Sequence, residues 1–138
     1  MSTVNEGVRA YLVAQSAITA LCSTRVRTTQ ADQSDDLPYI LLTTVSDMSV
    51  YAMAGEAGLA RARQQVDVIA RTPLAAIALS EAVRAAMSGY RGAMGTLPVR
   101  RCHRIDRSGP DLFGPDDGGQ RGKYRVRMDF AIDYHEST

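Results

Sequence analysis

The chain has 138 residues, of which 45% are hydrophobic and 22% are charged, and its formal net charge is +1. These values are ordinary for one soluble domain covering residues 1–138, and they exclude a chain that is disordered throughout. A net charge this close to zero argues against a general nucleic-acid-binding protein, which carries a clear basic excess. No apolar run approaches the length of about 20 residues that a membrane-spanning helix needs, so no membrane partner is expected.

The first part of the chain predicts a helix and two strands. Apolar residues recur every three or four positions over residues 4–21, which predicts an amphipathic helix with Gln15-Ser16 as a point where it can break in two. A short strand is expected over 24–30 and a well-buried strand over 39–45. We interpret 46–58 as the end of that strand followed by a glycine-containing loop.

The middle of the chain predicts a long strand followed by a helix. Over residues 59–71, small or apolar residues alternate with polar ones, which is the period of a strand with one buried face. Thr72-Pro73 is typical of a helix start, with threonine as the cap and proline in the first turn. An apolar stripe then predicts a helix over 73–88, which ends at Gly89.

The last part of the chain predicts two strands joined by a long loop. A strand is expected over 97–107, where simple alternation places Val99 and Cys102 on opposite faces. A glycine-rich loop follows over 108–122, and the most regular alternation in the chain predicts a strand over 123–135. The order of these segments predicts an α+β fold, in which a mostly antiparallel β-sheet has two helices packed on one face.

The sequence shows no pattern typical of a catalytic, metal or cofactor site. His103 lies among arginines and His135 lies near the C-terminus, and neither has a nucleophile at a motif spacing. Cys22 and Cys102 are far apart and outside any metal-binding spacing, so each is expected to be a buried free thiol in a reducing compartment. We therefore predict no catalytic residue, no metal, no cofactor and no enzymatic activity.

Two kinds of side chain are candidates for contacts with other proteins. Apolar residues in the expected loops form the first kind: Met48, Tyr51, Met53, Leu112 and Phe113. Arginines on the outer faces of the expected strands form the second: Arg61, Arg63, Arg125 and Arg127. Acidic residues interleave with these arginines, and no aromatic residue stands among them for base stacking, so a protein interface is favoured over a nucleic-acid surface.

Four segments that follow one another along the chain form a combined pattern. They are the proline-led strand Leu37-Pro38-Tyr39-Ile40, the strand over 63–70, the turn Gly89-Tyr90-Arg91-Gly92 after the helix, and the closing strand over 124–134. In this order they resemble the phage tail-completion or tail-terminator family. The resemblance covers nearly the whole chain, and its specificity lies in the combination of segments rather than in any one of them.

The resemblance implies a structural role and no catalytic residues. Such proteins form a ring, generally hexameric, at the head-proximal end of the tail tube, where the ring stops tube polymerisation and lets the neck dock. The partners implied are further copies of the chain, the tail tube protein and a head–tail connector or neck protein, with DNA passing through the lumen only transiently. The protein would be made in the host cytoplasm and then become part of a phage, prophage-derived or gene-transfer-agent particle.

A second hypothesis is a small ligand-binding or regulatory α+β dimer without catalysis. A stable dimer with a defined cavity would favour it over the ring.

Overall fold

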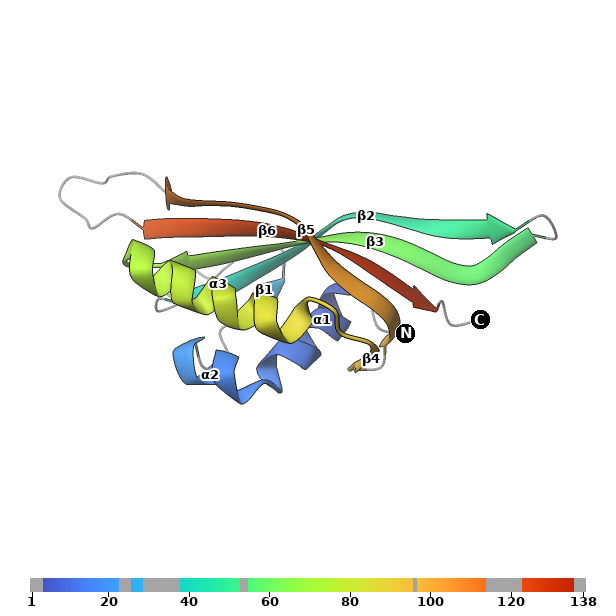
Figure 1. Ribbon diagram of the computed structural model, residues 1–138, viewed down its shortest axis with the longest axis horizontal. Coiled ribbons are helices and arrows are strands. Elements are labelled where there is room, and N and C mark those ends of the chain that lie inside the picture. Colours follow the sequence, from blue (N-terminus) through green and yellow to red (C-terminus); the bar gives the residue numbers. More distant parts are fainter. Residues whose placement is uncertain are drawn as a thin grey trace.

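The computed structural model describes residues 4–22, 26–28, 38–52, 55–95, 97–113 and 123–135, and within these it describes no side chains for 48–52, 55–59, 111–113, 123 and 135. The α+β prediction is confirmed (Figure 1). The described elements are α1 (Val4–Val13), α2 (Ser16–Cys22), β1 (Val26–Thr28), β2 (Tyr39–Ala52), β3 (Gly55–Ala70), α3 (Pro73–Met87), β4 (Gly92–Met94), β5 (Leu97–Phe113) and β6 (Lys123–His135).

The strands form one six-stranded sheet in the order β1-β2-β3-β6-β5-β4. β1 runs parallel to β2, and every other neighbouring pair is antiparallel, as the sequence predicts. The described helices cover one face of the sheet and leave the other face open (Figure 1). The first predicted helix breaks at Ala14 and Gln15 into α1 and α2, so three helices rather than two pack on the covered face.

The helix α3 forms where the sequence predicts it, and its ends show why. The Thr72 hydroxyl accepts a hydrogen bond from the Ala75 N–H at 3.1 Å, which satisfies one of the free donors of the first turn. Pro73 occupies the first helical position, where its missing N–H costs nothing. At the other end, Gly89 has a φ of +81°, a conformation that favours glycine and ends the helix.

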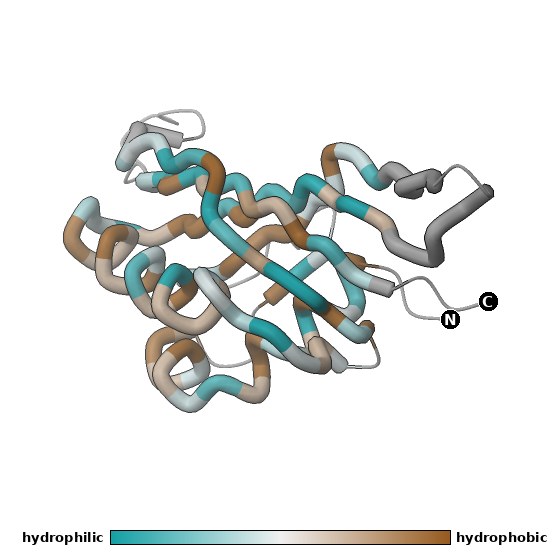
Figure 2. The backbone as a smooth tube through the Cα atoms, turned by 45° about the vertical axis from the view of Figure 1, so that its right-hand side comes forward, coloured by the Kyte–Doolittle hydropathy of each residue, from teal (hydrophilic) through white to brown (hydrophobic). Residues whose placement is uncertain are grey.

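One hydrophobic core lies between the helices and the sheet. On β3 and β6 the alternating residues that the sequence assigns to the inner face are buried, among them Val66, Met128 and Phe130. In Figure 2 the helices and central strands carry most of the apolar (brown) segments, whereas β5 is mostly hydrophilic (teal). Cys22 and Cys102 are buried and outside any disulfide, as predicted, and burial raises the pKa of Cys102 to about 12.

The two long loops predicted from glycine content are wrong over their described parts. β2 continues to Ala52 and pairs back onto β3, with Ser46 opposite Arg63 and Ala52 opposite Gly55. β5 continues to Phe113 along β6. In both cases the partner strand supplies hydrogen bonds that outweigh the poor intrinsic strand propensity of glycine and proline, a tertiary effect that the local sequence does not carry.

Between α3 and β5 the structure contains a short strand, β4, which pairs with β5 through Met94 and Leu97. The predicted alternation within 97–107 is also wrong. A bulge between Val99 and Arg101 adds one residue, so Val99 and Cys102 both face the core. The bulge keeps two apolar side chains buried while the intervening arginines stay in water.

A buried polar cluster joins α1 to the sheet. Gln64 on β3 is fully buried, and its amide nitrogen donates to Asn5 Oδ1 at 2.8 Å. The Thr44 hydroxyl lies 2.8 Å from Gln64 Oε1 and 3.0 Å from Asn5 Oδ1. Because buried polar groups are costly without partners, these three side chains depend on one another.

Gln64→Leu is expected to lower the free energy of unfolding by about 1–3 kcal/mol, because Asn5 and Thr44 lose a buried partner. The neighbouring Gln65 lies on the opposite face, where its amide donates to Asp67. Gln65→Leu is therefore the matched control, with an expected loss below about 1 kcal/mol. Urea denaturation followed by circular dichroism measures both, and equal losses would contradict a special role for the buried cluster.

Candidate functional site

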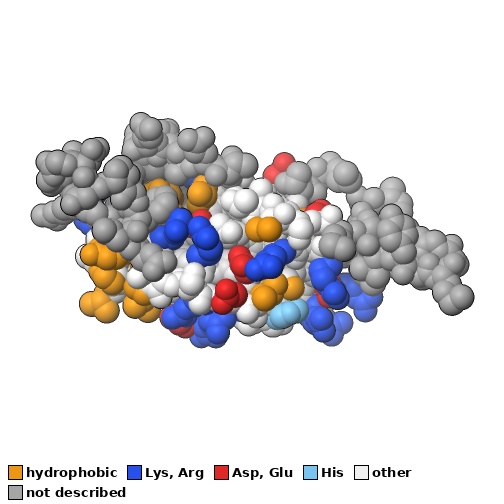
Figure 3. Space-filling view, turned by 90° about the horizontal axis from the view of Figure 1, so that it is seen from above, with side chains coloured by type: hydrophobic (Ala, Val, Ile, Leu, Met, Phe, Trp, Pro, Cys, Tyr) orange, Lys and Arg blue, Asp and Glu red, His pale blue; other side chains and the backbone are white. Residues whose placement is uncertain are grey.

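The face of the sheet opposite the helices is the candidate interaction surface. We call it the uncovered face and define it by outward side chains of β3, β6 and β5: Arg61, Arg63, Gln65, Asp67, Arg125, Arg127, Asp129, Asp133, Arg101, His103 and Asp106. On β3 and β6 strand alternation places them there, since their neighbours in sequence fill or border the core, and on β5 the register with outward residues of β6 does so. Seen from above in Figure 3, basic (blue) and acidic (red) side chains alternate across this face.

Asp133 on β6 lies between arginines of the two flanking strands. Its carboxylate accepts hydrogen bonds from Arg61 Nε at 2.8 Å and Arg61 Nη2 at 3.4 Å. Arg101 Nε on β5 lies 3.6 Å from Asp133 Oδ2, the oxygen to which Arg61 Nη2 also donates. The hydrogen bond and charge of Asp133 raise the pKa of Arg61, so this guanidinium stays charged under all ordinary conditions.

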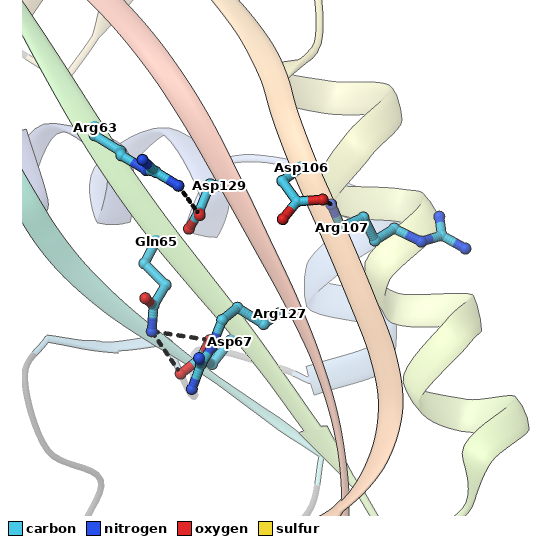
Figure 4. Close-up of polar contacts among 7 residues, drawn as sticks. All are labelled: Arg63, Gln65, Asp67, Asp106, Arg107, Arg127 and Asp129. Atoms are coloured by element: carbon cyan, nitrogen blue, oxygen red, sulfur yellow. Dashed lines mark hydrogen bonds and ion pairs between the residues drawn. The ribbon is translucent and has the colours of Figure 1, made fainter.

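Asp129, two positions earlier on β6, forms a second ion pair. Arg63 Nη2 donates to Asp129 Oδ2 at 2.7 Å, and this contact raises the pKa of Arg63 (Figure 4). Asp106 on β5 stands directly opposite Asp129 in the sheet register. Asp106 is held by the neighbouring backbone, because its Oδ1 accepts from the Arg107 N–H at 2.8 Å.

Asp67 on β3 forms a third cluster near the start of β6. The Gln65 amide donates to both carboxylate oxygens of Asp67, at 3.3 and 3.2 Å, and Arg127 Nε lies 3.4 Å from Oδ1 (Figure 4). Arg125 lies further along β6, opposite Ile69 of β3. The side chain of Asp67 is only 8% exposed, so its carboxylate is largely shielded from solvent by its neighbours on the sheet.

The arginines and aspartates of the uncovered face largely neutralise one another. Ion pairs between exposed side chains contribute about 0–1 kcal/mol each to stability, so this arrangement is not what holds the fold together. Fixed alternating charges act on recognition in general, because they favour a partner with the complementary pattern. A surface of this kind attracts polyanions weakly.

An ion cluster on the helix side fixes the edge strand β5. Arg107 reaches across to Glu81 of α3, and Glu81 also accepts a hydrogen bond from Arg84 at 2.8 Å. Figure 4 shows the Arg107 side chain directed toward that helix. The two guanidinium groups hold the pKa of Glu81 at about 2, so the cluster stays ionised at neutral pH.

The structure places Arg61, Arg63, Arg125 and Arg127 together on the uncovered face, and their part in contacts stays a prediction. The four apolar candidates Met48, Tyr51, Leu112 and Phe113 lie on strands instead of loops, and their side chains are outside the described ones. Met53 lies outside the described residues.

Sequence reasoning missed the exposed apolar residues that the structure reveals. Val45, Ile105 and Leu74 have exposed fractions of 52%, 48% and 79%. Their residue types and their places in strands or a helix predict core positions, so no local signal distinguishes them. His103, which the sequence assigns to the surface, is exposed.

No metal centre or membrane segment is present among the described residues. In that part of the chain, His, Cys, Asp and Glu side chains do not gather in groups of three or more that could hold a metal ion. The helices that the structure describes are all too short or too polar to cross a membrane.

Comparison with known proteins gives the fold and the family. The chain is similar to one solved within the "Virion of native gene transfer agent (GTA) particle", with a TM-score of 0.75 and 16% sequence identity, covering 96% of this chain and 94% of that one. No curated protein sequence matches. The family model for tail completion protein gp17 matches residues 6–134. The chain therefore belongs to the tail completion protein gp17 family, which confirms both the resemblance seen in its sequence and the expectation of a structural, non-enzymatic protein.

Proposed function

We propose that this protein forms a ring that closes the tail tube at its head-proximal end, stops tube polymerisation and lets the neck dock. The observation that carries the proposal is the family match over residues 6–134, which assigns the chain to tail completion. The likeness of its fold to a chain of a gene transfer agent virion supports a place in the tail of a phage or phage-like particle. Its partners would be further copies of itself, the tail tube protein and a neck or connector protein.

The uncovered face fits the lumen of such a ring. Genomic DNA must pass through the lumen without being retained, and a strongly basic wall would bind phosphates along its length. On this face Asp129 forms an ion pair with Arg63, and Asp133 forms ion pairs with Arg61 and Arg101, so these arginines are neutralised. The helices, which cover the opposite face, would then lie on the outside of the ring (Figure 1).

The test of the tail-completing role is deletion of this protein in cells that produce the particle. The expected result under electron microscopy is abnormally long tails, or tails that fail to join heads, with both defects reversed by the intact gene. Normal particles with normal titre would contradict the proposal. If light scattering instead showed that the purified protein is a stable dimer, and the particles were normal without it, the ligand-binding alternative would be favoured.

The neutral lumen gives a separate prediction. The variant Asp129→Asn with Asp133→Asn is expected to bind short duplex DNA more tightly than the native protein, because Arg61, Arg63 and Arg101 lose their carboxylate partners. Each arginine that gains a phosphate contact makes the slope of log affinity against log salt more negative by about 0.9. Fluorescence anisotropy over a salt series measures this slope, and Ser80→Ala on the helix side is a control without charge change.

A further inference from the structure

We propose that neighbouring copies of this chain join edge to edge, the open edge of β2 in one copy pairing with the open edge of β5 in the next. This inference rests on the proposed ring and names the surfaces that would form it. It would make the sheets of successive copies one continuous wall.

The first support is that both edges are open as far as the described residues extend. β1 pairs with β2 only from Ile40 to Leu42, and no described strand lies beside β2 from Thr43 onward. β4 pairs with β5 only from Leu97 to Val99, after which the Gly89 N–H donates to the Cys102 carbonyl at 2.7 Å. Beyond Cys102, β5 has β6 as its one described neighbouring strand. Open edges of this length present rows of backbone donors and acceptors that can pair with another chain.

The second support is a matching feature on the two edges. Each edge strand carries a bulge whose extra residue is a large β-branched apolar side chain: Val45 on β2, between Thr44 and Ser46, and Ile105 on β5, between Arg104 and Asp106. Their exposed fractions, 52% and 48%, place them among four exposed large hydrophobic residues in the described chain. A bulge on an edge strand disfavours nonspecific pairing with other strands. An exposed apolar residue at the bulge can still be buried by a partner whose surface fits it.

Strand direction allows this pairing without turning a copy over. β2, β3, β6 and β5 are successively antiparallel, so β2 and β5 run in opposite directions at opposite edges of the sheet. A second copy in the same orientation therefore presents its β2 antiparallel to the β5 of the first. The open part of β2 lies toward one end of the sheet and that of β5 toward the other, so the two overlap around Val45 and Ile105, which are both level with Phe130 of β6. Because the two edges differ, the contact is heterologous and can repeat until a ring closes.

Charge favours the β2–β5 pair over a pair of two β2 edges. Around its bulge the open part of β5 carries the exposed Arg104, while Arg107 is paired with Glu81 of α3 and Asp106 faces the other side of the sheet. The open stretch of β2 from Thr43 to Asp47 has no basic residue and carries the exposed carboxylate Asp47. A β2–β5 pair thus brings Asp47 near Arg104, whereas a β2–β2 pair would bring two Asp47 carboxylates together.

The experiment is disulfide trapping in assembled particles. Val45→Cys and Ile105→Cys are combined in the full chain, which is expressed in particle-producing cells that lack the native copy. After purification and mild oxidation, a non-reducing gel is expected to show a ladder of covalent multimers up to the ring size. Each single variant is expected to show no ladder, since a ladder needs both edges. The native thiols, Cys22 and Cys102, are buried and remain unreactive.

The matched control combines Leu21→Cys and Leu74→Cys, which place two thiols at exposed apolar positions on helices instead of strand edges. Normal particle titre under reducing conditions shows that each variant folds. A ladder from the Val45→Cys, Ile105→Cys variant alone supports the β2–β5 contact. If intact particles contain the protein but this variant gives no ladder, the β2–β5 contact is overturned and the ring proposal is not. A ladder from the Leu21→Cys, Leu74→Cys variant has the same consequence. Particles that form normally without the protein overturn both proposals.

Discussion

Leu79→Ala is expected to lower the free energy of unfolding by about 2–5 kcal/mol, because it removes a large side chain from the core and leaves a cavity. Leu79 is fully buried in α3, the helix that packs on β3, β5 and β6. A loss of this size corresponds to a decrease in Tm on the order of 10 °C for a chain of this length. Thermal unfolding followed by circular dichroism measures it.

The same helix supplies its own control. Leu74 lies one and a half turns earlier and is 79% exposed, so Leu74→Ala makes the identical chemical change where no core is lost. We expect a change within about 0.5 kcal/mol. If both alanine variants lost stability equally, α3 would not pack on the sheet through the face that contains Leu79. If neither did, the core would lie elsewhere.

Gly7→Val is expected to destabilise the protein by about 1–3 kcal/mol through overpacking. Gly7 sits in the middle of α1, where a glycine normally weakens a helix, yet here it allows close approach of the helix to the sheet. A Cβ atom at this position would lie 2.9 Å from the Met94 carbonyl oxygen and 3.0 Å from Leu97 Cβ. The Met94 oxygen belongs to the backbone of β4, so the clash cannot be relieved by a side-chain rotation.

Ala85→Val is the control for Gly7→Val, because it introduces the same β-branched side chain at an exposed position of α3. Only the weaker helix propensity of valine acts there, which costs about 0.5 kcal/mol. Denaturant midpoints compared between the two variants test the prediction. A Gly7 variant that is as stable as the native protein would show that α1 does not contact β4 as closely as the structure places it.

The elements that the sequence predicts well are those whose own residues determine them. The helix from Pro73 has its cap, its proline and its apolar stripe within one segment, and β6 shows its buried face by alternation alone. The extensions of β2 beyond Val45 and of β5 beyond Arg107 depend on a partner strand far away in sequence. Bulges also depend on a distant partner strand, since the register between two strands determines which residue has no partner opposite it.

The candidate site follows the same division. Arg61, Arg63 and Arg127 could be assigned to an outer sheet face from strand periodicity. Their partners could not, because the pairing of Arg61 with Asp133 joins positions 72 residues apart. The exposure of Val45 and Ile105 was not predicted, since a β-branched residue in a strand normally indicates the core.

The length of the β2–β3 hairpin has a consequence for how such a protein can diversify. Its paired strands extend past the helices, which is visible at one end of Figure 1, and pairing reaches Ala52 and Gly55. The described core residues of β2 lie at the other end, where Ile40 pairs with Val68, whereas β3 contributes core residues as far as Ala60. Because the hairpin extends by backbone pairing beyond the described core residues of β2, we expect its sequence to vary between family members more readily than the sequence around Ile40.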